Sequence, residues 1–169
     1  MRPQDIVILL KIISSKNKGL SKKQIAEELV ISASEVSEAL ERCRIAKLTD
    51  ESKTKVNTLA LEEFLLHGLK YVYPAVPLTK VRGIATAVSA PFFKDKITQN
   101  EDKYVWPDPK GDVRGTGILP LYKTVSCAVK TDQLLYNLLT IADVFRVGRV
   151  REIEIAKEEL HKIFSEYNA

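Results

Sequence analysis

The distribution of proline constrains this chain more than any other feature of its sequence. Six of the seven prolines lie between residues 74 and 120. Proline lacks a backbone N–H and fixes φ, so this stretch excludes long helices and central strands. The same stretch contains aromatic residues that a polar linker would lack, namely Phe92, Phe93, Tyr104 and Trp106. We therefore expect residues 74–130 to be an ordered, proline-rich connecting region that is irregular, with short extended segments at most.

Apolar residues recur at helical spacing on both sides of this region. Residues 1–73 have the pattern of successive helices, and residues 131–169 have that of a C-terminal helical region. Gly148 could separate two C-terminal helices or lie within one. The apolar positions of residues 134–145 and 150–164 need a partner, which is either the rest of the chain or a second subunit. The expected fold is mostly α, with three regions: 1–73, 74–130 and 131–169.

Residues 20–48 have the pattern of a helix-turn-helix. Ser21 with Gln24 forms a capping box at the start of a short helix, Lys22–Leu29. Val30 and Ile31 form the turn, and Ser32 caps a second helix. The apolar positions of that second helix are Val36, Ala39, Leu40 and Cys43. Its outward positions include the short side chains of Ala33, Ser34 and Ser37, which allow a backbone to approach the major groove.

This segment resembles the winged helix-turn-helix domains of prokaryotic transcription regulators of the broad MarR-like class. The residues that carry the resemblance are Leu20-Ser21, Ile25-Ala26, Leu29, Ile31-Ser32, Ser34, Val36-Ser37, Leu40, Ala46 and Leu48. The resemblance implies that residues 1–73 bind double-stranded DNA, that Ala33–Lys47 is the recognition helix, and that Asp50–Asn57 is the wing. The residues expected at the DNA are Lys22, Lys23, Ser32, Ala33, Ser34, Ser37, Glu38, Arg42, Lys53 and Lys55.

The charge of this region allows a second interpretation. Residues 1–57 contain eleven basic and eight acidic residues, which supports only modest phosphate affinity. Glu38 and Glu41 project from the face that would meet DNA, although a glutamate can accept a hydrogen bond from cytosine N4. The alternative is an adaptor whose acidic helix binds a basic protein.

The segment Trp106–Gly115 is the most distinctive part of the connecting region. Its sequence, Trp-Pro-Asp-Pro-Lys-Gly-Asp-Val-Arg-Gly, is similar to a segment of uncharacterised prokaryotic regulators of this length. This segment has two interpretations. Its polar residues could bind an effector or the substrate of an enzyme, or the segment is a structural loop of proline and glycine turns held by the tryptophan. We favour the structural loop. The residues concerned are Trp106, Asp108, Lys110, Asp112 and Arg114.

The composition excludes several other classes of protein. The two cysteines, Cys43 and Cys127, cannot form a disulfide framework or a four-thiolate zinc site, so we expect no metal and no cofactor. No apolar run approaches the roughly 20 residues of a membrane span, and the N-terminus lacks a signal-peptide pattern, which predicts a cytoplasmic protein without membrane contact. No catalytic residues are expected. The prediction is a homodimeric DNA-binding regulator with an unidentified effector, because two recognition helices about 34 Å apart increase affinity.

Overall fold

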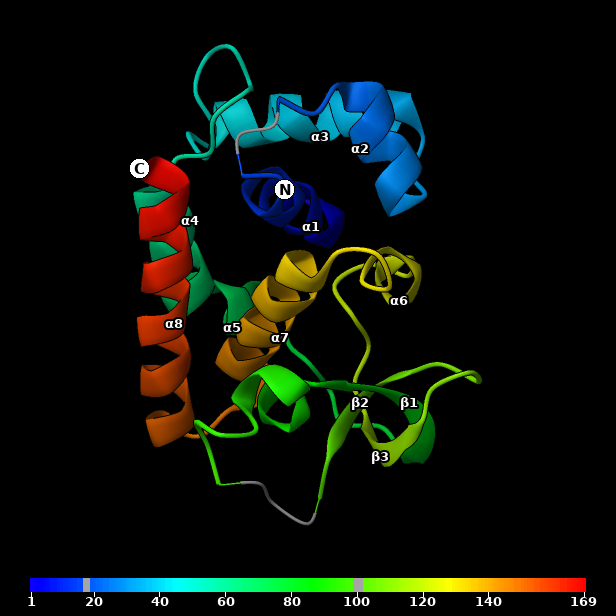
Figure 1. Cartoon of the computed structure of the whole chain (residues 1–169). Helices are drawn as coiled ribbons and strands as arrows, with labels where there is room; N and C mark the ends of the chain where they lie inside the picture. The colour runs from blue at the N-terminus through cyan, green and yellow to red at the C-terminus, as the bar shows by residue number, and fades with distance from the viewer. Residues whose placement is uncertain (17–18, 99–101) are drawn as a thin grey trace.

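The computed structural model describes residues 1–16, 19–98 and 102–169, and the protein is mostly helical (Figure 1). The helices are α1 (Pro3–Ser14), α2 (Lys22–Leu29), α3 (Ala33–Ile45), α4 (Thr58–Glu63), α5 (Leu69–Val72), α6 (Val125–Ala128), α7 (Gln133–Val147) and α8 (Val150–Asn168). A π-helical segment, Phe64–Gly68, joins α4 to α5. Within the described residues, no helix is long and apolar enough to cross a membrane.

Side-chain caps start the helices where the sequence predicts them. The Oγ of Ser21 accepts a hydrogen bond from the backbone N–H of Gln24 at 3.2 Å, and the Oε1 of Gln24 accepts from the N–H of Ser21 at 2.9 Å. Ser32 caps α3, because its Oγ accepts from the N–H of Glu35 at 3.2 Å. Each cap satisfies a backbone donor that the first helical turn leaves without a partner. The predicted starts of both helices are therefore confirmed.

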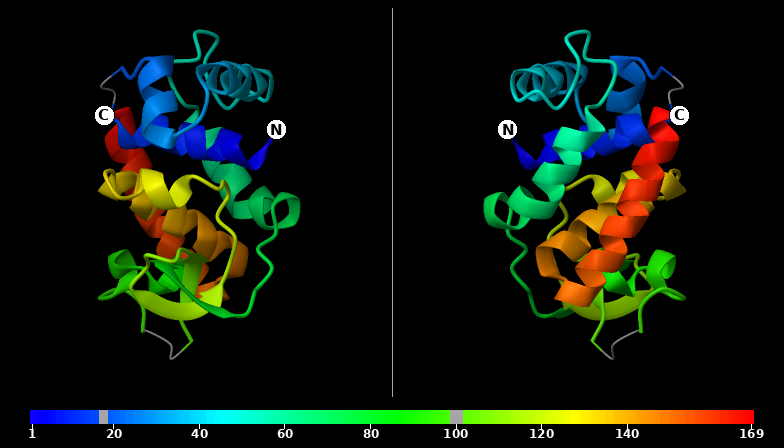
Figure 2. Two further views of the ribbon diagram at one scale, coloured as in Figure 1. Left: turned by 90° about the vertical axis from the view of Figure 1, so that its right-hand side faces the viewer. Right: turned by 90° about the vertical axis from the view of Figure 1, so that its left-hand side faces the viewer.

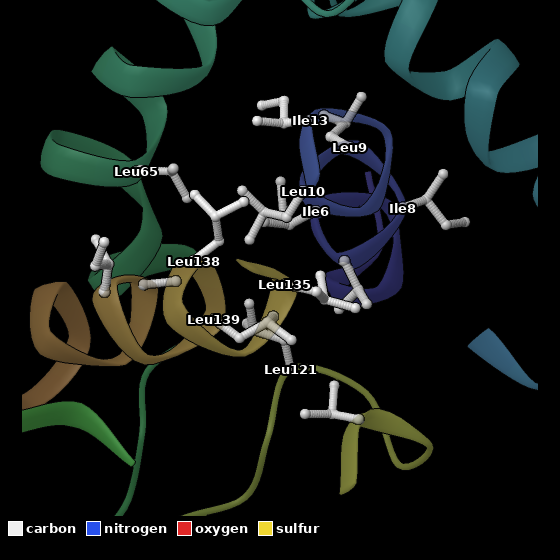
Figure 3. Close-up of a cluster of buried hydrophobic side chains, with 14 of the residues drawn as sticks. Ile6, Ile8, Leu9, Leu10, Ile13, Leu65, Leu121, Leu135, Leu138 and Leu139 are labelled. Atoms are coloured by element: carbon white, nitrogen blue, oxygen red, sulfur yellow. The ribbon is translucent and has the colours of Figure 1, made fainter. Parts of the chain in front are cut away.

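The central element of the core is α1, which is buried from Asp5 to Ile13. Figure 1 shows α1 between the α2–α3 pair and α7. In Figure 3, Ile6 and Leu10 of α1 point toward Leu138 of α7 and Leu65, whereas Ile8 points to the opposite side. One apolar core therefore joins the N-terminal and C-terminal helices.

The two C-terminal helices find their partners within the chain. α7 packs against α1 and α8, and α8 also contacts α4. The chain turns at Gly148, whose N–H donates to the carbonyl of Val144 at 2.7 Å, so residues 133–168 form two helices. Most of the apolar positions that the sequence offers to a second subunit are therefore covered within one chain, although Val150 is 80% exposed.

The proline-rich region contains more regular structure than the sequence predicts. It holds a small sheet of three strands, β1 (Lys80–Thr86), β2 (Tyr104–Pro107) and β3 (Val113–Gly117). β1 pairs antiparallel with both other strands, and β2 pairs with β3 in parallel, so the sheet is closed. The extended segments are short, as expected, but the expectation of an irregular region is wrong, because these segments pair into a sheet. The prolines lie outside β1 or at the end of β2, where they remove no central ladder bond.

A buried polar contact attaches this sheet to the helices. The Nε1 of Trp106 on β2 donates to the Oδ2 of Asp143 on α7 at 2.6 Å, and the hydroxyl of Thr86 on β1 donates to the same oxygen at 2.7 Å. Burial raises the pKa of Asp143, while Arg146, at 2.7 Å, is its ionic partner. Both views in Figure 2 show the sheet at the end of the molecule opposite α2 and α3.

Candidate nucleic-acid interface

α2 and α3 form a tight pair at one end of the molecule. Val30 ends α2 with a left-handed backbone, φ 55°, and the chain then turns directly into α3. The side of α3 that faces the core carries Val36, Ala39, Leu40 and Cys43, all buried as predicted. Figure 1 shows the remaining helices on the other side of α1, which leaves the outer side of α3 uncovered. We call the outward positions Ser34, Ser37, Glu38 and Glu41 the outer face of α3.

Small residues form the first half of the outer face and the start of α3 beside it. Ser32, Ala33 and Ser34 are exposed, and the hydroxyls of Ser32 and Ser34 lie 3.1 Å apart. The Nζ of Lys22, at the start of α2, donates to the Oγ of Ser37 at 3.3 Å. Small polar side chains with a lysine beside them allow close approach of a polar, anionic surface.

The segment that the resemblance assigns to a wing forms a tight turn. Thr49 and Val56 make one antiparallel bridge, and the N–H of Asp50 donates to the carbonyl of Lys55 at 3.0 Å. Burial raises the pKa of Asp50, but hydrogen bonds from Ser52 and from the N–H groups of Lys55 and Thr54 outweigh it and bring the pKa to about 2. The ionised carboxylate therefore fixes the turn. The side chain of Lys55 is exposed and makes no ion pair with the described residues.

A hollow of about 390 Å³ lies where the end of α1, the start of α2 and this turn meet. Leu20, Ile25 and Leu40 supply part of its apolar wall. Within the described part of the chain its lining includes no carboxylate. The polar lining residues are Ser15, Ser21, Lys22, Ser52, Lys53, Thr54 and Lys55. Lysines, hydroxyls and the N-terminal N–H groups of a helix all favour an anion.

Arg42 does not point into this interface. Its Nε and Nη2 donate to the two carboxylate oxygens of Asp5 at 3.0 and 2.8 Å, and Nη2 also donates to Glu35 at 2.8 Å. The hydrogen bond to Asp5 raises the pKa of Arg42, and the hydrogen bond from Arg42 lowers the pKa of Glu35. The sequence places Arg42 among the DNA contacts, but its guanidinium joins α3 to α1, and we leave it out of the interface.

The other cations near the end of α3 are also paired with carboxylates. Arg44 donates to Glu41 at 2.7 Å and to Glu51 at 2.8 Å, and Lys53 donates to Glu41 at 2.9 Å. The hydrogen bonds from Arg44 and Lys53 lower the pKa of Glu41 to about 2. Residues 20–57 contain seven basic and seven acidic residues. The basic and acidic residues of this region are therefore equal in number, and no excess positive charge remains.

Two predicted residues lie in more open positions. The side chain of Glu38 is 63% exposed, and its nearest cation is Nη1 of Arg42 at 3.7 Å. Lys23 is 83% exposed and lies 3.9 Å from Glu27. Both side chains can therefore move to meet a partner without breaking a strong internal bond.

The segment Trp106–Gly115 lies far from α3, within the closed sheet (Figure 2). Trp106 is buried, and the Oδ1 of Asp108 accepts from the N–H of Lys110 at 2.8 Å, which fixes the turn between β2 and β3. Asp112 is exposed, and Arg114 lies on β3. Among the described residues, no group of three or more His, Cys, Asp or Glu side chains is arranged to hold a metal. The geometry of this segment is that of a structural turn held by its tryptophan.

The structure also places together residues that the sequence does not connect. Arg82 on β1 is directly opposite Arg114 on β3. Arg2 donates to Glu35, 33 residues later in the chain. Local spacing gives no signal for either pair, because both depend on the tertiary fold.

Comparisons with known proteins assign no family to this arrangement. No protein-family model, curated protein or solved structure matches the chain.

Proposed function

We propose that residues 1–73 form a winged helix-turn-helix domain of the MarR-like class that binds double-stranded DNA, and that the protein is a homodimeric transcription regulator. The observation that supports this most strongly is the uncovered outer face of α3. Its first half carries small polar side chains, with Lys22 at one edge, and the turn at residues 50–55, which supplies Lys53 and Lys55, follows α3 in the chain. A helix of this kind fits the major groove, while the flanking lysines reach the phosphates.

Within this interface the residues have different roles. Lys22, Lys23 and Lys55 bind phosphate oxygens, because none of them is held by a strong ion pair among the described residues. Lys53 lines the hollow beside α2 and is paired with Glu41. It binds a phosphate there once it leaves Glu41. The bases are read by a short series of positions at the start of α3, which are Ser32, Ala33, Ser34, Ser37 and Glu38.

The balance of charge predicts weak binding by a single subunit. Each neutralised phosphate requires its own cation, and the region supplies few that are not already paired. Two domains joined in a dimer compensate for this, since the second contact becomes intramolecular. The homodimer is therefore part of the proposal.

The dimer contact is proposed at a surface other than the C-terminal helices. Residues 71–79 form a run without any charged side chain. Several large apolar side chains in and beside this run are exposed, namely Tyr71 (74%), Val72 (54%), Val76 (68%) and Leu119 (60%). The hydrogen bonds from Arg146 to the carbonyls of Tyr73 and Leu119 show that the two segments are neighbours. A neutral apolar strip can meet its own copy without repulsion of like charges.

The proposal is tested by fluorescence anisotropy with a labelled duplex from the region upstream of the protein's own gene. We expect Lys22→Gln and Lys55→Gln each to weaken binding several-fold, because each removes a phosphate contact. Lys157→Gln on α8 is the matched control, since it removes one exposed lysine far from α3. Equal affinity of all three variants and the parent protein, or no binding by the parent, contradicts the proposal.

One observation favours the adaptor as a second candidate. Arg42, Arg44 and Lys53 are all engaged with carboxylates, whereas Glu38 is largely exposed on the outer face. A basic peptide would supply a cation to the exposed Glu38. It would not need to displace an arginine or a lysine from a carboxylate. Binding of a lysine-rich peptide that Glu38→Lys abolishes, together with no binding of duplex DNA, supports the adaptor over the regulator.

A further inference from the structure

The closed sheet holds two arginines side by side. Arg82 on β1 and Arg114 on β3 are directly opposite in the antiparallel register, and both are exposed. Side chains of directly opposite residues lie on the same face of a sheet, with Cβ atoms about 5 Å apart. Two positive charges at this separation destabilise the sheet unless an anion lies between them.

The backbone positions of the two arginines are held by tightly packed neighbours. Next to Arg82, a Cβ on Gly83 would lie 2.0 Å from the carbonyl oxygen of Trp106. Next to Arg114, a Cβ on Gly115 would lie 2.3 Å from the carbonyl oxygen of Lys103. Both close approaches are made to the β2 side of the sheet, so close backbone packing holds β1 and β3 in place relative to β2.

No carboxylate of the described residues forms an ion pair with either arginine. Neither guanidinium makes a hydrogen bond or an ion pair with the described residues. Two nearby cations do have acidic partners, because Lys80 lies 2.7 Å from Asp102 and Lys130 lies 4.0 Å from Asp108. Asp112, two residues before Arg114, is exposed and makes no ion pair with either arginine among the described residues.

The surrounding region holds an excess of positive charge. Residues 74–130 contain nine basic and five acidic residues, while the formal net charge of the whole chain is +4. Residues 20–57, by contrast, are balanced. The region that contains the sheet therefore carries a net charge of +4, whereas residues 20–57 carry none.

We propose that Arg82 and Arg114 form a binding site for a phosphate group. Two planar guanidinium forks can donate parallel hydrogen bonds to the oxygens of one phosphate, which removes the repulsion between them. The phosphate belongs to a free phosphate ion, a nucleotide or the backbone of a nucleic acid. This site lies at the opposite end of the molecule from α3 (Figure 1), so it is independent of the proposed DNA contact.

The site is tested by isothermal titration calorimetry and by the melting temperature of the protein at constant ionic strength. The probes are inorganic phosphate, a nucleoside monophosphate, a short single strand and a short duplex. The variants are Arg82→Gln and Arg114→Gln, with Arg151→Gln, an exposed arginine on α8, as the matched control. A Lys22→Gln/Lys55→Gln protein removes proposed contacts at α3 and keeps the two tests separate.

We expect at least one of these phosphate probes to raise the melting temperature of the parent protein, and both sheet variants to lose at least tenfold in affinity for it. In chloride alone, the sheet variants should melt at or above the parent temperature, because the repulsion is gone. A response to inorganic phosphate shows that a free phosphate ion or a nucleotide is enough to occupy the site. A response to oligonucleotides alone shows that the site binds the backbone of a nucleic acid. An equal response of Arg82→Gln and Arg151→Gln, or no response of the parent to any probe, overturns the proposal.

Discussion

The carboxylate of Asp5 accepts two hydrogen bonds from the guanidinium of Arg42, with distances of 3.0 Å to Nε and 2.8 Å to Nη2. Asp5 lies in the first turn of α1 and is fully buried, and its Oδ2 also accepts from the N–H of Arg2 at 2.8 Å. This pair connects the central helix of the core to α3. The position of the outer face of α3 therefore depends on a contact that lies between α3 and α1, away from that face.

Removing the guanidinium should destabilise the protein strongly. Arg42→Ala leaves the carboxylate of Asp5 buried without its cation, and we expect a loss of about 3 kcal/mol in the free energy of unfolding. The control is Arg44→Ala, whose pairs with Glu41 and Glu51 lie at the surface, with an expected loss of about 1 kcal/mol or less. Urea denaturation measures both values. Equal losses in the two variants would show that the Asp5–Arg42 pair has no special role.

The closed sheet should not tolerate a side chain at Gly83. A Cβ at this position would lie 2.0 Å from the carbonyl oxygen of Trp106, so Gly83→Ala must separate β1 from β2. We expect a loss of about 3 kcal/mol in the free energy of unfolding, the upper end of overpacking effects. Gly19→Ala is the comparison, since Gly19 has φ +63° but open space around it, and we expect a loss of about 1 kcal/mol. A Gly83→Ala protein with parental stability would contradict the strand pairing.

Stability should fall in acid through Glu41. Hydrogen bonds from Arg44 and Lys53 lower its pKa from 4.5 to about 2, so the folded protein keeps this carboxylate ionised where the unfolded chain protonates it. The unfolded state then binds more protons, and the stabilisation, complete above about pH 4.5, is lost as the pH falls toward 2. Glu41→Gln should therefore show a shallower decline in urea midpoint between pH 6 and pH 3 than the parent.

A suitable comparison for this pH dependence is Glu154→Gln, which removes an exposed carboxylate on α8 that has no ion pair among the described residues. It should decline with pH as the parent does. If Glu41→Gln and the parent lose stability in parallel, the ion pairs of Glu41 do not act in solution.

The local parts of the fold could be predicted from the sequence. The capping box of Ser21 with Gln24, the cap at Ser32 and the buried side of α3 all depend on residues within a few positions of one another. The same holds for the start of α7, where Asp132 accepts from the N–H of Leu135 at 2.9 Å. Apolar periodicity and helix caps are local signals in the sequence, so the helices that depend on them could be predicted.

The long-range contacts could not be predicted in this way. Arg42 has the exposure pattern of a helix surface residue, but its main partner lies 37 residues earlier in the chain. Arg82 and Arg114 become neighbours only through strand pairing. Proline density correctly excluded long helices from residues 74–130, but it could not reveal that the proline-free segment Lys80–Thr86 pairs with two other strands.

The salt dependence of DNA affinity tests the central claim most directly. The affinity of the parent protein for a duplex is measured from low to physiological salt, beside Lys22→Gln, Lys55→Gln and the control Lys157→Gln. Each lysine that binds a phosphate contributes about 0.9 to the slope of log affinity against log salt. We predict that each of the first two variants lowers the slope by about 1, as expected for one lost phosphate contact, and that the control leaves it unchanged. A parent protein that does not bind at any salt concentration, or slopes that are identical in all four proteins, would contradict DNA binding through α3.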